Sequence, residues 1–399
     1  MSRTTISLEQ RIAAPPSEVY RAFTNSTALR EWLCDAAMVV PRKDGRLQLG
    51  WNSGFHATGE FTKVVPNERL SFTWHGKGEP GPTRVRVDFR PEGEATLVAL
   101  VHKGIGTGKK WAKAAEEIRD GWEESLENLR SVLETGHDLR FTRRPMMGIL
   151  PDTLTVEAAA KLGVPVAKGI LLGGVVEGMG AEAAGLQKGD VITRIGEAKV
   201  RDYPDLQAAL QRHHAGDEVA VTYYRGAEKA RTALTLSGRP VEEPPATAAA
   251  LSAALSATEA DYLDRLAAAF EGVEDARARR RPAAGEWSAD EVLCHLIVEA
   301  RATQHFITQL VGGQEPWTDE WTGNLDVAHA GLLAVFPNSG GLLKELRRNR
   351  AETWAILAAL PDEFVARKGS YWRMAYGLSE GRLHDEEHLL QVQTALAAG

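Results

Sequence analysis

Cysteine is almost absent from this chain. Only two cysteines, Cys34 and Cys294, occur among 399 residues. A disulfide scaffold is therefore excluded, and this cysteine usage is typical of proteins in a reducing compartment. No run of about 18 apolar residues occurs, so no membrane-spanning helix is expected. The opening residues MSRTTISLEQRI also lack the apolar core of a secretory signal peptide, and we expect a cytoplasmic protein.

Positive charge is not concentrated anywhere in the sequence. Lysine and arginine total 47, aspartate and glutamate total 54, and the formal net charge is −7. A mildly acidic chain without a basic run binds nucleic acid and anionic membranes poorly, so neither is expected as a partner. Hydrophobic residues make up 43% and charged residues 25% of the chain, values typical of globular domains. At about 150 residues per domain, the length predicts two or three domains.

The sequence pattern changes twice and divides the chain into three domains. Residues 1–136 mix alternating, strand-like runs with helical patterns, which predicts an α+β domain. Residues 137–240 are rich in glycine and strand-like runs, and residues 253–399 are almost wholly helical in period. The Pro/Ala/Glu-rich residues 241–252 are expected to form a linker. The predicted fold class is therefore multidomain α+β with an all-α domain at its end.

The first domain has the pattern of a sheet closed by a long helix. ISLEQRI alternates apolar and polar residues as a half-buried strand does, and Ser17 can cap the short helix that follows. Five more strand-like runs come next: RLQLGW, HATGEFTKVV, ERLSFTWH, TRVRVDFR and ATLVALVHK. From about Trp111 to Leu133 apolar residues recur every three or four positions, which predicts one long amphipathic helix.

IAAPPSEVYRAFTN, LREWL and GWEESLENLRSVLE, in this element order, resemble the START-like (SRPBCC) helix-grip family, in particular its activator-of-heat-shock-ATPase subgroup. The resemblance implies a curved sheet that grips the long helix around a cavity for a small apolar ligand. Five aromatic residues are candidate cavity walls: Trp32, Trp51, Phe55, Phe72 and Trp74. The alternative is that these side chains form an ordinary hydrophobic core, which a packed sheet–helix interface needs in any case.

The second domain has the most specific pattern in the chain. RPMMGIL precedes VVEGMGAEAAGLQKGDVI, and a helical stretch near residues 203–213 leads into AGDEVAVTYYR. Nearly the whole segment resembles a PDZ domain of the kind attached to HtrA-type proteases. The resemblance implies a β-sandwich-like domain that binds the C-terminal peptide of a partner protein by strand addition.

The candidate peptide-binding residues lie on a loop and on a helix: Met146, Met147, Gly148, Ile149, Leu206 and Leu210. The loop backbone would hold the terminal carboxylate, and its glycine would allow close approach. The two leucines, four positions apart, would line the pocket for the last side chain. Two adaptable methionines precede the glycine, so a broad apolar preference is expected. The alternative is a PDZ fold kept as a spacer without a ligand.

A protease activity is not expected to accompany this domain. Asn338-Ser339-Gly340-Gly341 has the letters of a serine-protease nucleophile loop, but it follows the PDZ-like segment and lacks a preceding Gly–Asp environment. No upstream segment has a two-barrel strand pattern that carries a histidine and an aspartate. Asn338 or Ser339 is more simply a helix cap.

Four helical blocks predict a four-helix bundle in the third domain, at about 256–275, 289–312, 340–360 and 380–397. His384 and His388 are four residues apart, so both imidazoles project from one face of the last helix. Such a pair is a bidentate metal site, and a histidine from a neighbouring helix would add a third ligand. Three protein ligands leave at least one coordination position open for water or substrate.

GEWSADEVLCHLIVEA and HDEEHLLQV resemble the two signature stretches of the DinB-like (YfiT/DinB) superfamily. The resemblance implies that His295, His384 and His388 bind a divalent metal; zinc and nickel are expected first, and the metal's identity stays open. It also implies a metal-dependent thiol transferase or related detoxification and stress enzyme, whose metal activates a thiol substrate. No catalytic residue is assigned.

Several features of this third domain have a simpler structural explanation. Glu299, Glu386 and Glu387 are candidate bases near the histidines, although a solvated helix face explains such charges more simply. Cys294 adjoins His295 but points about 100° away on a helix, so it is expected in the core. The histidines themselves could be purely structural. The alternative to an enzyme is a stress-response adaptor that combines a ligand cup, a peptide socket and an inactive bundle.

Overall fold

The computed structural model describes residues 3–211, 213–239, 241, 243–314 and 323–398. They form two compact units: unit 1 contains residues 1–137 and 243–399, and unit 2 contains residues 138–242. Unit 2 therefore interrupts the sequence of unit 1. Among the described residues, no helix combines the length and the apolar character needed to cross a bilayer.

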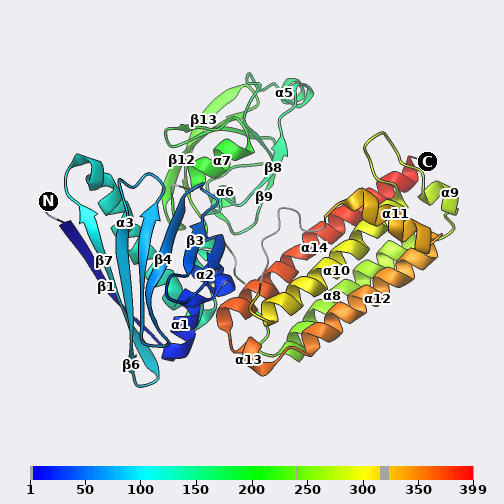
Figure 1. The fold of residues 1–399 in the computed structure, drawn as a ribbon. Helices are drawn as coiled ribbons and strands as arrows, with labels where there is room; N and C mark the ends of the chain where they lie inside the picture. The colour runs from blue at the N-terminus through cyan, green and yellow to red at the C-terminus, as the bar shows by residue number, and fades with distance from the viewer. Residues whose placement is uncertain (1–2, 212, 240, 242, 315–322, 399) are drawn as a thin grey trace. The chain divides into compact units, whose positions relative to one another are not determined.

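The N-terminal part of unit 1 is a seven-stranded antiparallel sheet with a long helix, the predicted helix-grip architecture (Figure 1). The strand order is β1-β7-β6-β5-β4-β3-β2. The strands are β1 Arg3–Ile12, β2 Ala36–Val39, β3 Arg46–Gly50, β4 His56–Val65, β5 Arg69–Gly76, β6 Thr83–Glu92 and β7 Ala95–Gly106. The helices are α1 Pro16–Thr24, α2 Ser26–Trp32 and α3 Lys109–Thr135.

The long helix α3 follows the predicted apolar stripe. Ile118, Trp122, Leu126 and Leu129 are all buried in the core under the sheet. The helix ends at Gly136, whose φ of 89° is the left-handed conformation that glycine adopts without strain. The short edge strand β2 was missed, because its four residues AAMV do not alternate in polarity.

The C-terminal part of unit 1 is a bundle in which α8, α10, α12 and α14 run side by side (Figure 1). The helices are α8 Ala248–Ala269, α9 Asp275–Ala278, α10 Ala289–Val311, α11 Leu325–Val335, α12 Ser339–Ala358, α13 Asp362–Val365 and α14 Lys368–Ala397. Ser288 and Glu291 form a reciprocal capping box at the start of α10. Asn338 caps α12, as the sequence predicted.

The last helix is longer than predicted. It begins at Lys368 rather than near residue 380, and Tyr371, Trp372 and Met374 are buried along its first turns. Glycines 377 and 381 lie inside this helix and break the propensity signal, although tertiary packing outweighs their unfavourable helix propensity. One helix thus spans both the aromatic segment and the histidine pair.

Helix α14 also joins the bundle to the N-terminal part of unit 1. The Ser370 hydroxyl donates a hydrogen bond to Glu31 of α2, and the Lys368 ammonium donates to the backbone carbonyl of Glu134 in α3. His137 Nε2 lies 2.8 Å from Glu243 Oε1, at the two positions where the chain leaves and re-enters unit 1. The chain therefore departs and returns at neighbouring points.

Unit 2 has one sheet with the strand order β13-β12-β10-β9-β8, and β11 pairs with β10. Its strands are β8 Ile149–Thr153, β9 Ile170–Val175, β10 Val191–Ile195, β11 Ala198–Lys199, β12 Glu218–Arg225 and β13 Glu228–Thr235. Its helices are α4 Leu139–Thr142, α5 Val156–Leu162, α6 Gly180–Ala183 and α7 Tyr203–Leu210. Strand β8 is an edge strand of this sheet.

Candidate functional site

Three imidazoles meet inside the bundle of unit 1. His295 comes from α10, and His384 and His388 come from successive turns of α14. The Nε2 atom of His384 lies 2.9 Å from Nε2 of His388 and 3.5 Å from Nε2 of His295. One ligand atom from each residue lies within 4.8 Å of the other two. The structure thus brings the three predicted ligands together, with their Nε2 atoms facing one another.

On two of the rings the opposite nitrogen lies next to a side-chain oxygen, in a hydrogen bond for His388 and at ion-pair distance for His384. His388 Nδ1 lies 2.9 Å from Gln391 Oε1, and His384 Nδ1 lies 3.1 Å from Glu299 Oε2. An acceptor oxygen beside Nδ1 favours the tautomer with the proton on Nδ1, and in that tautomer Nε2 keeps a lone pair for the centre. Such contacts fix the ring orientation of metal-binding histidines. Glu299 is therefore placed to position His384.

The electrostatic environment favours neutral imidazoles. Burial, with added repulsion from His388 and His384, lowers the pKa of His295 to about 3. Burial also lowers the pKa of His388. A neutral imidazole is the form that binds a metal, so these two rings stay competent as ligands well below neutral pH. A donor set of three imidazole nitrogens, two of them from buried rings, fits a borderline cation such as zinc or nickel.

An aromatic wall closes one side of the histidine group. The Trp287 ring centroid lies 4.9 Å from that of His295, and it stacks on His388 at 6.5 Å. Behind it, His329 of α11 lies 5.2 Å from Trp287 and is only 2% exposed. Sequence spacing alone links neither Trp287 nor His329 to the other three histidines.

A cavity of about 110 Å³ lies beside the histidines between α8, α10, α12 and α14. His384 and Glu299 form its wall toward the three rings. The remaining lining combines apolar and charged side chains: Leu255, Glu259, Ala300, Thr303, Arg350, Thr353, Trp354, Gly377, Leu378 and Asp385. At about 30 Å³ per water molecule, this volume holds three or four waters or one small functional group.

Arg350 is a largely buried cation in the wall of this cavity, and no sequence pattern points to it. Its Nη1 lies 2.9 Å from Glu259 Oε1 of α8, and its Nη2 lies 2.9 Å from Asp385 Oδ1 of α14. Burial lowers the pKa of Arg350, but the two carboxylates outweigh burial and raise it. The guanidinium therefore stays charged and ties α8, α12 and α14 together next to His384.

The other candidates near the histidines lie away from the centre. Glu386 forms an ion pair with Arg265 of α8, and Glu387 is exposed, so both are surface charges. Cys294 is fully buried in the bundle core, and burial raises its pKa to about 12. The thiol stays protonated and inward, as the sequence predicted.

The candidate peptide groove of unit 2 is partly assembled from core residues. Met147 and Leu206 are 2% and 3% exposed and belong to the core of unit 2, and Ile149 and Leu210 pack against the same core. Gly148 has a φ of 78°, and a Cβ there would lie 2.2 Å from the Cβ of Met179. Only glycine fits this turn of the loop.

One predicted loop donor is already used within the fold. The backbone N–H of Met146 donates to the Ser237 carbonyl at 2.8 Å, and the N–H of Ser237 donates back to Met146. Met146 therefore fixes the loop to the strand end rather than pointing its own N–H into an anion nest. The N–H groups of the residues after it stay the candidates for carboxylate binding.

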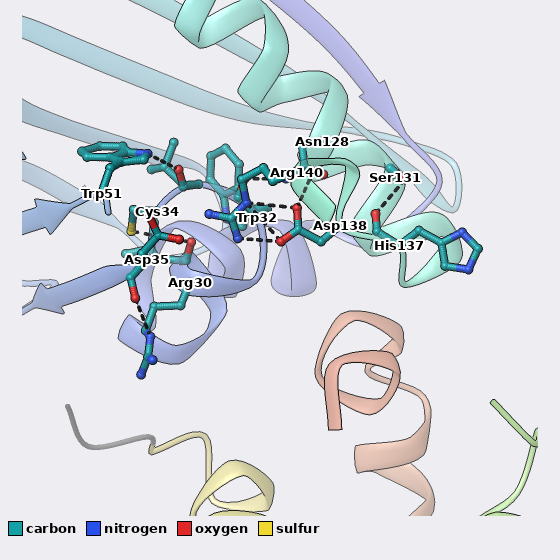
Figure 2. Close-up of polar contacts among 12 residues, drawn as sticks. Arg30, Trp32, Cys34, Asp35, Trp51, Asn128, Ser131, His137, Asp138 and Arg140 are labelled. Atoms are coloured by element: carbon teal, nitrogen blue, oxygen red, sulfur yellow. Dashed lines mark hydrogen bonds and ion pairs between the residues drawn. The ribbon is translucent and has the colours of Figure 1, made fainter. Parts of the chain in front are cut away.

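The predicted cavity walls of the N-terminal part are packed against its core. Trp32, Phe72 and Trp74 are 1%, 4% and 6% exposed, and Trp51 and Phe55 pack against them. Trp51 Nε1 donates to the Leu33 carbonyl at 2.7 Å, and Asn128 donates to the Trp32 carbonyl at 2.7 Å (Figure 2). These contacts fit the core explanation, and the ligand cavity stays a prediction.

His102, in the same core, is a buried histidine of a different kind. Its Nε2 lies 2.6 Å from Thr83 Oγ1, and its Nδ1 accepts a hydrogen bond of 3.1 Å from Trp122 Nε1. Burial lowers its pKa to about 4, so the ring is neutral. Both of its nitrogens are occupied by protein partners, which leaves no lone pair for a ligand.

Comparison with family models finds three domains in this chain. Residues 13–134 match the Activator of Hsp90 ATPase homolog 1-like protein family, residues 145–236 match the PDZ domain, and residues 257–392 match the DinB superfamily. These are the three families that the sequence resembles, in the predicted order. The helix-grip domain, the PDZ domain and the helical bundle account for the mixed α and β structure.

Curated relatives match the PDZ segment. A serine protease Do-like HtrA from Lactococcus lactis subsp. cremoris is 36% identical over 115 residues, which are 28% of each protein. A zinc metalloprotease RasP from Shouchella clausii is 37% identical over 94 residues, 23% of this chain and 22% of that protein. The chain thus spans only about a quarter of the length of these relatives.

Solved structures match the N-terminal part. CalU16 from Micromonospora echinospora is 28% identical and has a TM-score of 0.27, with 31% of this chain and 71% of that chain covered. An HSP90 activator from Plasmodium falciparum is 24% identical with a TM-score of 0.29, covering 33% of this chain and 96% of that chain.

Proposed function

We propose that the bundle of unit 1 binds one divalent cation through Nε2 of His295, His384 and His388. The observation that carries this proposal is the convergence of three imidazoles, two of them buried, whose ligand atoms lie within 4.8 Å of one another. Three imidazoles would not be packed together for stability alone, because polar nitrogens that face each other lose more solvation than they regain. The match to the DinB superfamily, a superfamily of metal-binding bundles, supports the same reading.

The proposed activity is transfer of a small thiol. When bound, the cation would supply a Lewis acid that lowers the pKa of a thiol or water in its open position. The chain's own residues prepare that position. Glu299 orients His384, Trp287 shields one side of the rings from water, and the neighbouring cavity of about 110 Å³ admits a thiol-bearing group of a few atoms.

Metal analysis tests this proposal directly. Protein purified without chelator or histidine tag should contain close to one equivalent of zinc or nickel by elemental analysis, and the His384→Ala variant should contain almost none. The matched control is His305→Ala, which removes an exposed histidine from the same helix α10. A wild-type protein without metal after reconstitution contradicts the site. A loaded protein without turnover on a panel of thiols and electrophiles contradicts the activity but not the site.

We propose a second function for unit 2, the binding of protein C-termini. The observation that favours it is a free edge strand, β8, directly after a loop whose glycine lies in the left-handed region. Arg143 and Arg144 are exposed immediately before this loop, where positive charge favours a carboxylate. The chain would then combine a metal centre with a module that brings a partner protein, in the setting of a stress response. Without a metal centre, peptide binding by unit 2 would make the protein a non-enzymatic stress-response adaptor.

A further inference from the structure

The edge strand of unit 2 carries a proline at its centre. Strand β8 reads Ile-Leu-Pro-Asp-Thr, and its last four residues are exposed. A proline has no backbone N–H, so within sheets it is confined largely to edges. On an edge strand the missing N–H usually serves to prevent pairing with other chains. Here the missing N–H also affects function, because β8 is the strand to which a partner's peptide would be added.

The hydrogen bonds of the loop show which residues of β8 face the free edge. The N–H of Val176 donates to the Gly148 carbonyl at 2.8 Å, and Leu150 is paired with Gly174 of β9. Backbone groups alternate in direction along an antiparallel strand. Gly148, Leu150 and Asp152 therefore bond inward to β9. The backbone groups that point outward belong to Ile149, Pro151 and Thr153. The register shift between Leu150 and Pro151 places the extra residue, Gly173, on β9, so the alternation along β8 is not interrupted.

The three outward positions form the rungs that a peptide could use. Ile149, the first rung, keeps its N–H and carbonyl. Pro151, the second rung, has no N–H to donate. The N–H of Thr153, the third rung, already donates to the Asp152 carboxylate at 2.6 Å. Two successive donors are therefore lost at the same edge, one by residue type and one by an intramolecular bond.

We propose that unit 2 recognises only about the last three residues of a free protein C-terminus. This inference rests on the proposed peptide-binding function and specifies its partner. The carboxylate and the final apolar side chain supply the affinity, through the glycine loop and the pocket near Ile149 and Leu210. Residues further from the terminus find no backbone donor on β8. Such a socket accepts many proteins that share an apolar end and differ upstream of it.

The test uses the full chain and fluorescence anisotropy with N-terminally labelled peptides. The probes are a heptapeptide ending in Ala-Val-Val with a free carboxylate, its last three residues alone, and the heptapeptide as a C-terminal amide. The wild-type protein should bind the heptapeptide and the tripeptide with Kd values within about threefold, because the extra residues add no net hydrogen bond. Amidation should weaken binding at least about tenfold, since a charge-assisted contact is lost.

The variant Pro151→Ala restores the missing donor. It should tighten binding of the heptapeptide and of the tripeptide about threefold to tenfold, the factor that one net hydrogen bond gives, because both peptides contain the carbonyl of the third-last residue. A heptapeptide with an ester in place of the amide after its third-last residue has a weaker acceptor there, and its gain should disappear. The matched control is Pro165→Ala, which removes an exposed proline from the α5–β9 loop and should change neither affinity.

The outcomes separate this inference from the function on which it rests. If the wild-type protein binds the heptapeptide tenfold or more tightly than the tripeptide, the inference about the missing donors is wrong, although the proposed peptide binding is not. The inference is also overturned if Pro151→Ala raises the affinity for the all-amide heptapeptide and for the backbone-ester heptapeptide by the same factor. If no free-carboxylate peptide binds either protein, the proposed peptide function itself fails, and the inference fails with it.

Discussion

Two regions of unit 1 bury histidines, and they do so in opposite ways. In the sheet–helix core, His102 has one nitrogen against Thr83 and the other against Trp122. In the bundle, His295, His384 and His388 turn their Nε2 atoms toward each other. Burial lowers the pKa of His102 and of His295 alike, so burial does not distinguish them. What distinguishes a structural histidine from a candidate ligand is the partner of its second nitrogen.

The largest expected effect breaks the bundle side of this comparison. His388→Ala should reduce the metal content from about one equivalent to below about a tenth, because two imidazoles hold a divalent cation far more weakly than three. The substitution also removes the contacts of His388 with Gln391 and Trp287, so the thermal unfolding of the apo-protein shows whether the variant is still folded. Elemental analysis and thermal unfolding in chelator measure the two quantities. Retained metal would show that His388 is not a ligand.

The reciprocal change is in the core. His102→Leu leaves the Trp122 N–H buried without its acceptor, and it should lower the free energy of unfolding by about 2 kcal/mol or more. Metal content should be unchanged. Urea unfolding followed by tryptophan fluorescence gives the stability, and elemental analysis gives the occupancy. Loss of metal from this variant would contradict the assignment of His102 as a purely structural histidine.

The pH dependence of stability sharpens the same contrast. The pKa of His102 is about 4 when folded and about 6.5 when unfolded, so between these values the unfolded chain binds a proton that the folded chain does not. Its contribution is complete above about pH 6.5 and is lost as the pH falls toward 4, a total of about 3 kcal/mol. Wild type and His102→Leu should therefore converge in unfolding free energy between pH 7 and pH 4.5. A constant gap between them contradicts the pKa assignment.

A smaller effect is expected at the residue that orients a ligand. Glu299→Ala removes the acceptor of the His384 Nδ1 proton and should weaken metal binding about tenfold to a hundredfold, as is typical when such partners are lost. Glu299→Gln retains an acceptor oxygen and should lose less. Competition with a chromogenic chelator measures both. Equal affinity in all three proteins would mean that Glu299 is only a surface charge.

The smallest effect is expected when unit 2 is deleted. The chain leaves unit 1 at His137 and returns at Glu243, and these side chains are 2.8 Å apart. Joining them by a short Gly–Ser linker should leave the metal content and the thermal midpoint of unit 1 almost unchanged, because a flexible linker replaces a self-contained insertion. Unfolding of the deletion variant at a much lower temperature would show that unit 2 supports the fold of unit 1.

The sequence predicted those parts of the molecule that follow from local spacing. The four-residue interval of His384 and His388, the Asn338 cap and the stripe of α3 each depend on helical geometry alone, and each is seen in the fold. The convergence of His295 with the other two came from a family resemblance, since no local pattern in α10 points to α14.

What could not be predicted depends on contacts across long sequence separations. Arg350 resembles any surface arginine in the string RRNRAE until α8 and α14 bring Glu259 and Asp385 to it. His329 and Trp287 adjoin the histidine group only after α11 packs on α10. The sequence shows that Pro151 lacks a backbone N–H, but it does not show that the strand containing Pro151 lies at the edge of the sheet.

The way α14 bridges unit 1 sets an order for synthesis. The contacts of Lys368 and Ser370 with α3 and α2 join residues more than two hundred positions apart, on either side of unit 2. During translation the N-terminal sheet therefore emerges first. The surface of α2 and α3 that α14 contacts stays uncovered until the ribosome has made the whole of unit 2 and most of the bundle. Only then can the same helix that carries His384 and His388 dock. A frameshift after residue 242 would leave unit 2 attached to an N-terminal sheet without the helical bundle that covers it.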